Sequence, residues 1–162
     1  MISNHSELLH AVDDAAAAEI RGLGSIVRVG PGELLFRLGD EAAKLYLIER
    51  GRVALTLPMR VPNLEEEVLI EERQSGQTLG WSALVPPHRF TLSAKALVDT
   101  EVLALPRPRL LAYFDQHPEV GYAVTRNVAA VTSQRLQVFQ AMWLREMQRV
   151  VELRTLRAPV MP

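Results

Sequence analysis

The chain has 162 residues, of which 48% are hydrophobic and 23% charged, as in globular proteins that bury a core. Its 18 basic and 19 acidic residues give a net charge of −1, which argues against a general electrostatic grip on nucleic acid or on an anionic membrane. Because cysteine is absent, disulfides, thiolate metal sites and cysteine nucleophiles are excluded.

The N-terminal zone, residues 1–24, is expected to form a helix. Apolar side chains recur at nearly helical spacing over residues 4–21, Asn4 or Ser6 can cap the start, and Gly22 lies just past the end. The first residues lack the basic and apolar regions of a secretory signal, and no apolar run reaches the roughly 18 residues of a membrane span. We therefore expect a cytoplasmic protein without membrane contact.

Residues 25–106 change to a β-rich pattern. Val53, Leu55 and Leu57 alternate with other residues, as in a half-buried strand. The expected strands are Ile26–Val29, Leu34–Phe36, Leu45–Glu49, Val53–Leu57, Val68–Glu72, Thr91–Val98 and Glu101–Leu105. Short strands separated by glycine-containing and proline-containing turns indicate a barrel or a sandwich.

Residues 107–155 return to a helical pattern. Pro108 can open a short helix, and Pro118 can occupy the first turn of a long helix that ends near Arg154. The tail, residues 156–162, is expected to be frayed.

The long helix carries two apolar sets, which need two surfaces to pack against. One set comprises Leu136, Phe139, Trp143, Val150 and Leu153, and the other comprises Val124, Val128, Val131, Val138 and Met142. One set can pack on the β-rich zone while the other forms a homodimer interface. The alternative is a monomer whose helix folds one broad face against the β-rich zone. We expect the dimer, with an interface formed by Leu136, Phe139, Trp143 and Val150.

The sequence contains no catalytic or metal-binding pattern. The four histidines have no metal-ligand spacing, and no serine lies in a Gly-x-Ser-x-Gly elbow. The glycine pairs at residues 22–24 and 30–32 lack the context of a dinucleotide site. We expect no enzyme, no metal site and no bound cofactor, and we interpret the acidic residues 65–67 and 71–72 as the solvated rim of a hairpin.

Residues 76–96 combine the features of a site for a small anion. The candidate ligand-binding residues are Gly80, Trp81, Ser82, Ala83, Leu84, Arg89, Phe90 and Thr91. N–H groups at a helix start within residues 82–85, together with the guanidinium of Arg89, can hold a phosphate or another small anion. The alternative is a structural loop in which Trp81 fills the core and Arg89 pairs with a surface carboxylate.

The order of these parts resembles the cyclic-nucleotide-binding domain, the effector domain of the catabolite activator and related Crp/Fnr-type regulators. The stretches that carry the resemblance are Gly32-Glu33-Leu34-Leu35-Phe36-Arg37-Leu38-Gly39-Asp40, Leu45-Tyr46-Leu47-Ile48-Glu49-Arg50-Gly51-Arg52-Val53 and Asp99-Thr100-Glu101-Val102-Leu103-Ala104-Leu105. The resemblance implies a mainly β fold with flanking helices. Its centre is a double-stranded β-helix of jelly-roll type, the β-roll, followed by a long C-terminal helix.

The resemblance is weaker at the ligand site. The family's phosphate-binding cassette has a glutamate that takes the ribose hydroxyl and an arginine that holds the cyclic phosphate. Gly80 matches the cassette glycine, but Trp81 and Ser82 replace the glutamate position. Counting forward from Gly80 places Arg89 at the arginine position, whereas counting back from the last β segment places Phe90 there. The resemblance therefore implies a cassette without the ribose contact. It does not decide whether Arg89 or Phe90 occupies the position that contacts the phosphate.

Two functions remain open from the sequence. The first is a stand-alone regulatory domain that senses cyclic AMP, cyclic GMP or another small anion and signals through its C-terminal helix to a protein partner. In that case Arg135, Phe139 or Gln140 could face the ligand. The second is a degenerate β-roll that binds no nucleotide and acts as a dimerisation or protein-interaction module. Because no helix-turn-helix follows the long helix before Pro162, we expect no direct contact with DNA.

Overall fold

The computed structural model describes residues 6–157, and the predicted cap Asn4 and residues 158–162 of the predicted tail lie outside the described residues. The chain divides into two compact units, Met1–Val128 and Ala129–Pro162. The first unit holds the β-rich zone with the helices that flank it, and the second holds the remainder of the long helix.

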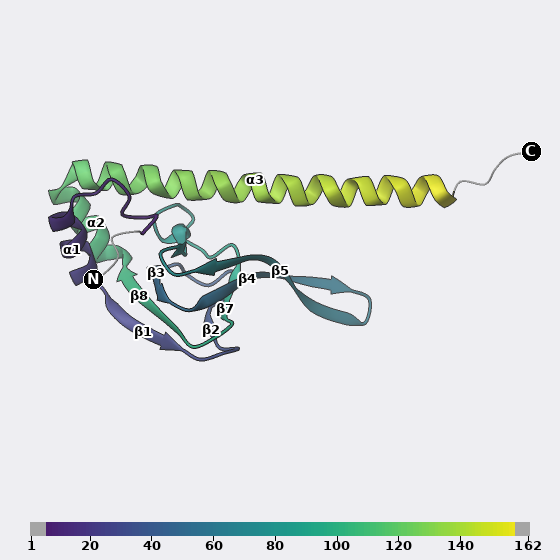
Figure 1. The fold of residues 1–162 in the computed structure, drawn as a ribbon, viewed down its shortest axis with the longest axis horizontal. Helices are drawn as coiled ribbons and strands as arrows, with labels where there is room; N and C mark the ends of the chain where they lie inside the picture. Colours follow the sequence, from purple (N-terminus) through teal and green to yellow (C-terminus); the bar gives the residue numbers. More distant parts are fainter. Residues whose placement is uncertain (1–5, 158–162) are drawn as a thin grey trace, which may run out of the picture. The chain divides into compact units, whose positions relative to one another are not determined.

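Two four-stranded antiparallel sheets form the β-roll (Figure 1). The strands are β1 (Ser25–Val29), β2 (Leu34–Phe36), β3 (Lys44–Arg50), β4 (Arg52–Val61), β5 (Leu64–Gln74), β6 (Thr78–Leu79), β7 (Ser93–Ala96) and β8 (Thr100–Pro106). One sheet has the order β1-β8-β3-β6 and the other β2-β7-β4-β5. This topology confirms the predicted mainly β, jelly-roll-like fold.

The core of the β-roll lies between the two sheets. The most completely buried side chains from its strands are Leu45, Leu47, Ile48, Val53, Leu55, Leu79, Val102 and Leu105. The turn from β3 to β4 depends on Gly51, whose φ is +105°. A Cβ at this position would lie 2.7 Å from the Cα of Thr100, so both the backbone conformation and the packing require glycine.

The hairpin of β4 and β5 extends further than the sequence pattern predicts. Its register places Arg60 opposite Glu65, and the two side chains form an ion pair of 3.5 Å between Nε and Oε1. Pairing across the strands therefore continues through a polar stretch that shows no apolar alternation. The two-residue strand β6 was not predicted, because two residues are too few to show a period.

The first helix, α1 (Asp14–Gly22), begins well after the predicted start. The carboxylate of Asp13 accepts a hydrogen bond of 2.9 Å from the N–H of Ala16, which makes Asp13 the N-cap. Ala11, at φ +59°, is in the left-handed region and prevents one continuous helix. The preceding residues form turns that nevertheless bury Leu8 and Leu9, which explains their apolar character.

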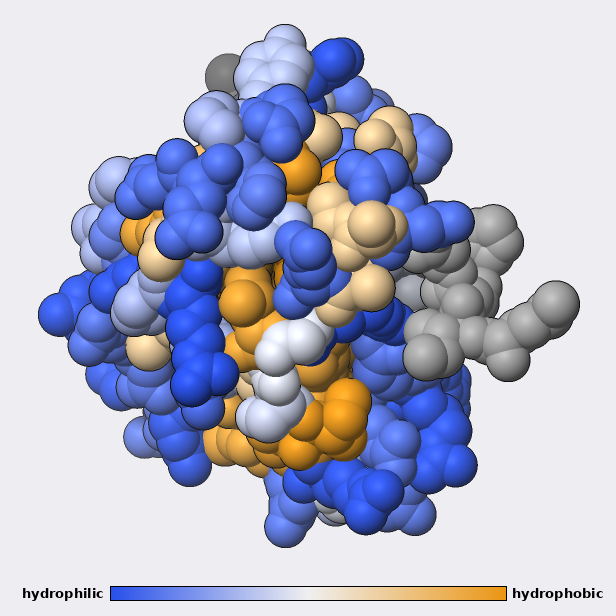
Figure 2. All heavy atoms as spheres, turned by 90° about the vertical axis from the view of Figure 1, so that its left-hand side faces the viewer, coloured by the Kyte–Doolittle hydropathy of each residue, from blue (hydrophilic) through white to orange (hydrophobic). Residues whose placement is uncertain are grey.

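Two further helices follow the β-roll, α2 (Arg107–Gln116) and α3 (Pro118–Arg157), as predicted. Within the first unit, α1 and α2 lie at one end of the β-roll (Figure 1), and the face at this end carries apolar surface among hydrophilic residues (Figure 2). The absence of a side chain at Gly121 allows α3 to approach α2, since a Cβ there would lie 2.9 Å from the Cβ of Phe114. None of the helices in residues 6–157 has both the length and the apolarity needed to cross a membrane.

Candidate functional site

The predicted cassette forms a sharp turn after β6. Gly80 has a φ of +73°, and the 3-10 helix η1 (Trp81–Ala83) follows it. The N–H of Ala83 donates to the carbonyl of Gly80 at 3.0 Å, and the N–H of Leu84 donates to that of Trp81 at the same distance. A Cβ at Gly80 would lie 2.9 Å from Cε1 of Phe90, so only glycine fits the backbone and the space.

An aromatic stack lies beside this turn inside the β-roll. The ring of Phe90 is 5% exposed and stacks on Phe36, with centroids 3.8 Å apart and an interplanar angle of 13°. Phe36 stacks in turn on Tyr46 at 5.7 Å. Burial raises the pKa of the Tyr46 hydroxyl above its usual value, as expected for a phenol removed from water. Phe90, rather than a charged side chain, therefore occupies the interior beside Gly80.

Arg89 lies on the opposite side of the same segment. Two backbone hydrogen bonds to the turn at residues 39–40 fix the segment: Phe90 N–H donates to Asp40 O at 3.0 Å, and Gly39 N–H donates to Phe90 O at 2.8 Å. Because neighbouring side chains in an extended segment point to opposite faces, an inward Phe90 directs Arg89 outward. Nη1 of Arg89 donates to the Gly39 carbonyl at 2.8 Å, and the residue is exposed.

The structure thus divides the predicted ligand-binding residues into two groups. Gly80, Ser82, Ala83 and Phe90 are buried together, whereas Arg89 and Thr91 are exposed. Trp81 and Leu84 are half-buried, so the large side chain buried at this site is Phe90 and not Trp81. Nδ1 of His88 donates to the backbone carbonyl of Ser82 at 3.1 Å and holds the loop against η1. Ligand binding by these residues stays a prediction.

A second polar cluster, which the sequence did not indicate, lies where β5 leads into β6. The side chain of Arg73 is 5% exposed and contacts the carboxylates of Glu7 and Glu71, the latter at 2.9 Å between Nη1 and Oε1. The prediction that Glu71 belongs to a solvated rim is therefore wrong, because its carboxylate pairs with a buried guanidinium. The N–H of Thr78 donates to the same Oε1 atom of Glu7 at 2.6 Å. Glu7 and Arg73 are 66 residues apart in the sequence, and contacts over such a separation leave no periodic signal.

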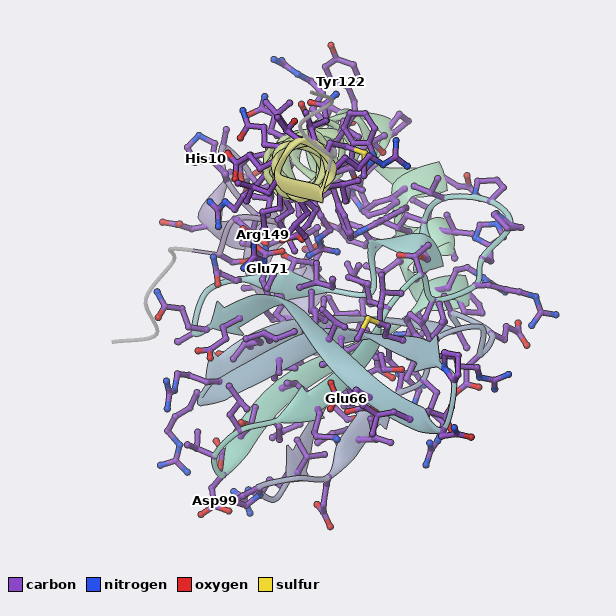
Figure 3. All side chains as sticks on the ribbon, turned by 90° about the vertical axis from the view of Figure 1, so that its right-hand side faces the viewer. His10, Glu66, Glu71, Asp99, Tyr122 and Arg149 are labelled. Atoms are coloured by element: carbon purple, nitrogen blue, oxygen red, sulfur yellow. The ribbon has the colours of Figure 1, made fainter. Side chains whose placement is uncertain are left out.

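An open hollow of about 400 Å³ lies at the turns that join β1 to β2 and β7 to β8. Arg28 and Arg50 line it, and both contact Oε1 of Glu101, at 2.9 and 3.4 Å. Both arginines are largely exposed, so these ion pairs contribute little. Figure 3 places Asp99, another lining residue, at the edge of the β-roll away from Glu71.

The residues predicted to form a dimer interface lie on the part of α3 that belongs to the second unit. Leu136 is 58% exposed, Trp143 is 65% exposed, Val150 is also exposed, and Phe139 is half-buried. Their role in a dimer stays a prediction. Among residues 6–157, no group of three or more histidine, aspartate or glutamate side chains could hold a metal ion.

Comparison with known proteins gives one family match. A family model described as "Cyclic nucleotide-binding domain" matches residues 26–117, which is more than half of the chain and runs from β1 to the end of α2. Two curated relatives are lysophospholipase nte1 of Neurospora crassa, 26% identical over 104 residues, and that of Aspergillus fumigatus, 25% identical over 103 residues. Both alignments cover 64% of this chain, which spans only 7% of the length of either relative.

Two solved structures share the fold over most of the chain. The N-terminal domain of a transcriptional regulator from Streptomyces coelicolor is 28% identical, with a TM-score of 0.68, and the match covers 83% of this chain and 94% of that one. The catabolite activator protein of Thermus thermophilus is 27% identical, with a TM-score of 0.67, and the match covers 93% of this chain and 63% of that one. These similarities agree with the resemblance stated from the sequence.

Proposed function

Because the chain belongs to the cyclic nucleotide-binding domain family, we propose that it is a non-enzymatic regulatory module that acts in the cytoplasm by protein–protein contact through α3. In this proposal the β-roll does not hold a cyclic nucleotide by the arginine and glutamate contacts of the family. The module therefore acts as a dimerisation and interaction domain, and its partner is a protein rather than nucleic acid.

The position of Phe90 carries this proposal. A cyclic phosphate is a monoanion that needs a donor such as a guanidinium inside the β-roll. The buried ring of Phe90 stands beside Gly80 instead, stacked on Phe36 at 3.8 Å. The nearest arginine along the chain, Arg89, hydrogen-bonds to a carbonyl on the surface. Without a carboxylate between Glu72 and Asp99, the ribose contact is also missing.

Exposed apolar side chains on α3 support a protein partner. Leu136, Trp143, Val151, Leu153 and Leu156 are all more than half exposed. A soluble chain that exposes this much apolar surface along one helix gains free energy when a partner covers it. We propose a second copy of the chain as that partner.

A second candidate function is the sensing of a small anion, with cyclic AMP or cyclic GMP as the ligand. The exposure of Arg89 favours it, because an exposed guanidinium held by a hydrogen bond to the Gly39 carbonyl can rotate at little cost. The left-handed Gly80 followed by the short helix η1 also supports it, because the resemblance implies a glycine and a helix start at this point of the cassette. A ligand that changes the position of α3 would need different affinities for its two positions.

Isothermal titration calorimetry with cyclic AMP and cyclic GMP tests the proposal. We expect no binding heat up to millimolar ligand for the wild-type chain. Micromolar binding that Arg89→Ala abolishes would establish the second candidate. Micromolar binding that survives Arg89→Ala would also overturn the proposal, and it would show that a residue other than Arg89 holds the nucleotide. Arg60→Ala, which removes an exposed guanidinium from the β4–β5 hairpin and gives the same change in charge, is the matched control.

A further inference from the structure

The cluster of Glu7, Arg73 and Thr78 has the donor arrangement of a site for an oxyanion. We propose that Arg73 and the backbone N–H of Thr78 form a binding site for a small monoanionic oxyanion, and that the Glu7 carboxylate fills this site until such an anion displaces it. The ligand class is a carboxylate or a phosphodiester group. This site does not depend on the cassette, and it goes beyond the proposed function.

The contacts of Glu7 are those that a bound anion would make. Its Oε1 atom accepts from Nη2 of Arg73 and from the N–H of Thr78, the latter at 2.6 Å. A guanidinium combined with a backbone N–H is a common donor pair for carboxylates and phosphates. Because the side chain of Arg73 is 5% exposed, water does not compete with these hydrogen bonds as it does on the surface.

Two buried polar atoms of the same cluster remain unsatisfied. Within the part of the chain that the structure describes, Nε of Arg73 and Oγ1 of Thr78 have no hydrogen-bond partner. Buried donors without partners are rare in folded proteins and cost stability. A phosphodiester presents more acceptor oxygens than the single oxygen that Glu7 uses, and it can satisfy donors that Glu7 leaves unpaired.

The charges of the cluster favour a single negative charge on the ligand. Nη1 of Arg73 contacts Glu71 at 2.9 Å, so one carboxylate remains beside the guanidinium after Glu7 leaves. A dianion in place of Glu7 would leave an excess of negative charge in a buried position, which is unfavourable. A monoanion keeps the charge balance that Glu7 provides.

The position of Glu7 permits the exchange. Its side chain is 24% exposed, so the carboxylate can rotate into water and expose the donors to a ligand. The backbone of this segment is held independently, because Leu8 and Leu9 are buried and the N–H of Glu7 donates to Gly76 O at 3.0 Å. The site can therefore open without unfolding the segment.

Displacement of Glu7 would change a hydrogen-bonded connection between β6 and α3. Nδ2 of Asn127 in α3 donates to the carbonyls of Leu8 and His10, at 2.7 and 2.8 Å. The segment from Glu7 to His10 thus links α3 to β6, the strand that leads into Gly80. An anion that replaces Glu7 removes one hydrogen bond from this link, which gives the site a physical route to α3.

The test compares Glu7→Ala with Glu66→Ala by NMR titration of the Thr78 amide with dimethyl phosphate and with acetate. Glu66 lies on β5, is exposed, and gives the same change in charge, so it is the matched control. Removal of a competitor that fills the site most of the time should tighten binding by about tenfold in Glu7→Ala. Glu66→Ala should match the wild type. Equal binding by Glu7→Ala and the wild type would overturn the proposal.

Three further measurements test the site without the Glu7→Ala variant, without Arg89 and with a dianion. In the wild type, a saturable shift of the Thr78 amide at millimolar dimethyl phosphate supports the site, and the absence of any shift at that amide contradicts it. The same titration in Arg89→Ala should be unchanged, because Arg89 is bonded to Gly39 and not to this cluster. Sulfate at equal ionic strength should bind more weakly than dimethyl phosphate, and tighter sulfate binding would contradict the charge argument.

Discussion

At the scale of single residues, the side chain that points into the β-roll beside Gly80 is the ring of Phe90 and not the guanidinium of Arg89. Counting along the sequence left Arg89 and Phe90 as alternatives for one inward position. The backbone hydrogen bonds to the turn at residues 39–40 select Phe90, and they do so through the register of a loop. Loop register depends on long-range backbone contacts, which residue spacing alone does not encode.

Phe90→Ala should therefore lower the free energy of unfolding by about 3–5 kcal/mol, the usual cost of truncating a buried phenylalanine. The loss combines the removed burial with the cavity left beside Phe36 and Tyr46. Urea denaturation followed by circular dichroism measures it. Tyr122→Ala removes an exposed aromatic ring and should cost under about 1 kcal/mol. A loss in Phe90→Ala no larger than in this control would show that the ring is not part of the core.

At the scale of secondary-structure elements, apolar composition and turn residues predicted the strands of the β-roll, whereas the predicted alternation in β4 was wrong, because Ala54 and Thr56 are buried together with Val53 and Leu55. The central strands contain runs such as Leu45–Ile48 whose burial follows from composition and turn residues. The hairpin extension to Leu64 rests on cross-strand charge pairs, and the late start of α1 rests on a cap at Asp13 and a left-handed Ala11. These features depend on individual hydrogen bonds and backbone angles, which leave no hydrophobic period.

The contact between α1 and α2 gives an element-scale prediction. The hydroxyl of Tyr113 in α2 donates to Oε2 of Glu19 in α1 at 2.7 Å. Desolvation, this hydrogen bond and the negative charges of Glu19, Asp13 and Glu119 raise the pKa of Tyr113 to about 12. The folded state thus retains a proton that the unfolded chain, with an ordinary tyrosine pKa of about 10, gives up.

The sign of the effect follows from this difference in proton affinity. The stabilisation by Tyr113 is complete below pH 10 and is lost as the pH rises towards 12, because only the unfolded state is deprotonated in that window. Ultraviolet difference titration of the wild type against Tyr113→Phe should show one tyrosine that ionises near pH 12 and is missing in the variant. If the missing transition instead lies near pH 10, the hydrogen bond to Glu19 does not hold the proton in solution.

At the scale of the whole molecule, α3 exposes apolar side chains that a partner would cover in the proposed dimer. Leu136 and Trp143 lie seven residues apart on the helix, with Phe139 between them, which is the spacing of a two-stranded helical interface. An aromatic side chain buries at most about 150–250 Å², whereas a stable interface buries about 1,200–2,000 Å² in total, so a dimer through Phe139 and Trp143 also needs the aliphatic side chains exposed along α3. The sequence predicted that α3 carries these apolar side chains, because helical periodicity is a local property. The identity of the partner that would cover them cannot be derived from residue spacing.

A second copy of the chain is the partner that the proposed function requires, and sedimentation velocity tests it. The wild type should sediment as a dimer, whereas Phe139→Glu and Trp143→Glu should sediment as folded monomers, because each places a charge in a buried apolar contact. Gln137→Glu introduces the same charge at an exposed position outside the apolar set and should remain dimeric. Dimers that persist in both interface variants would place the contact elsewhere on the molecule. A wild type that is monomeric at every concentration would leave the exposed face of α3 for a different protein.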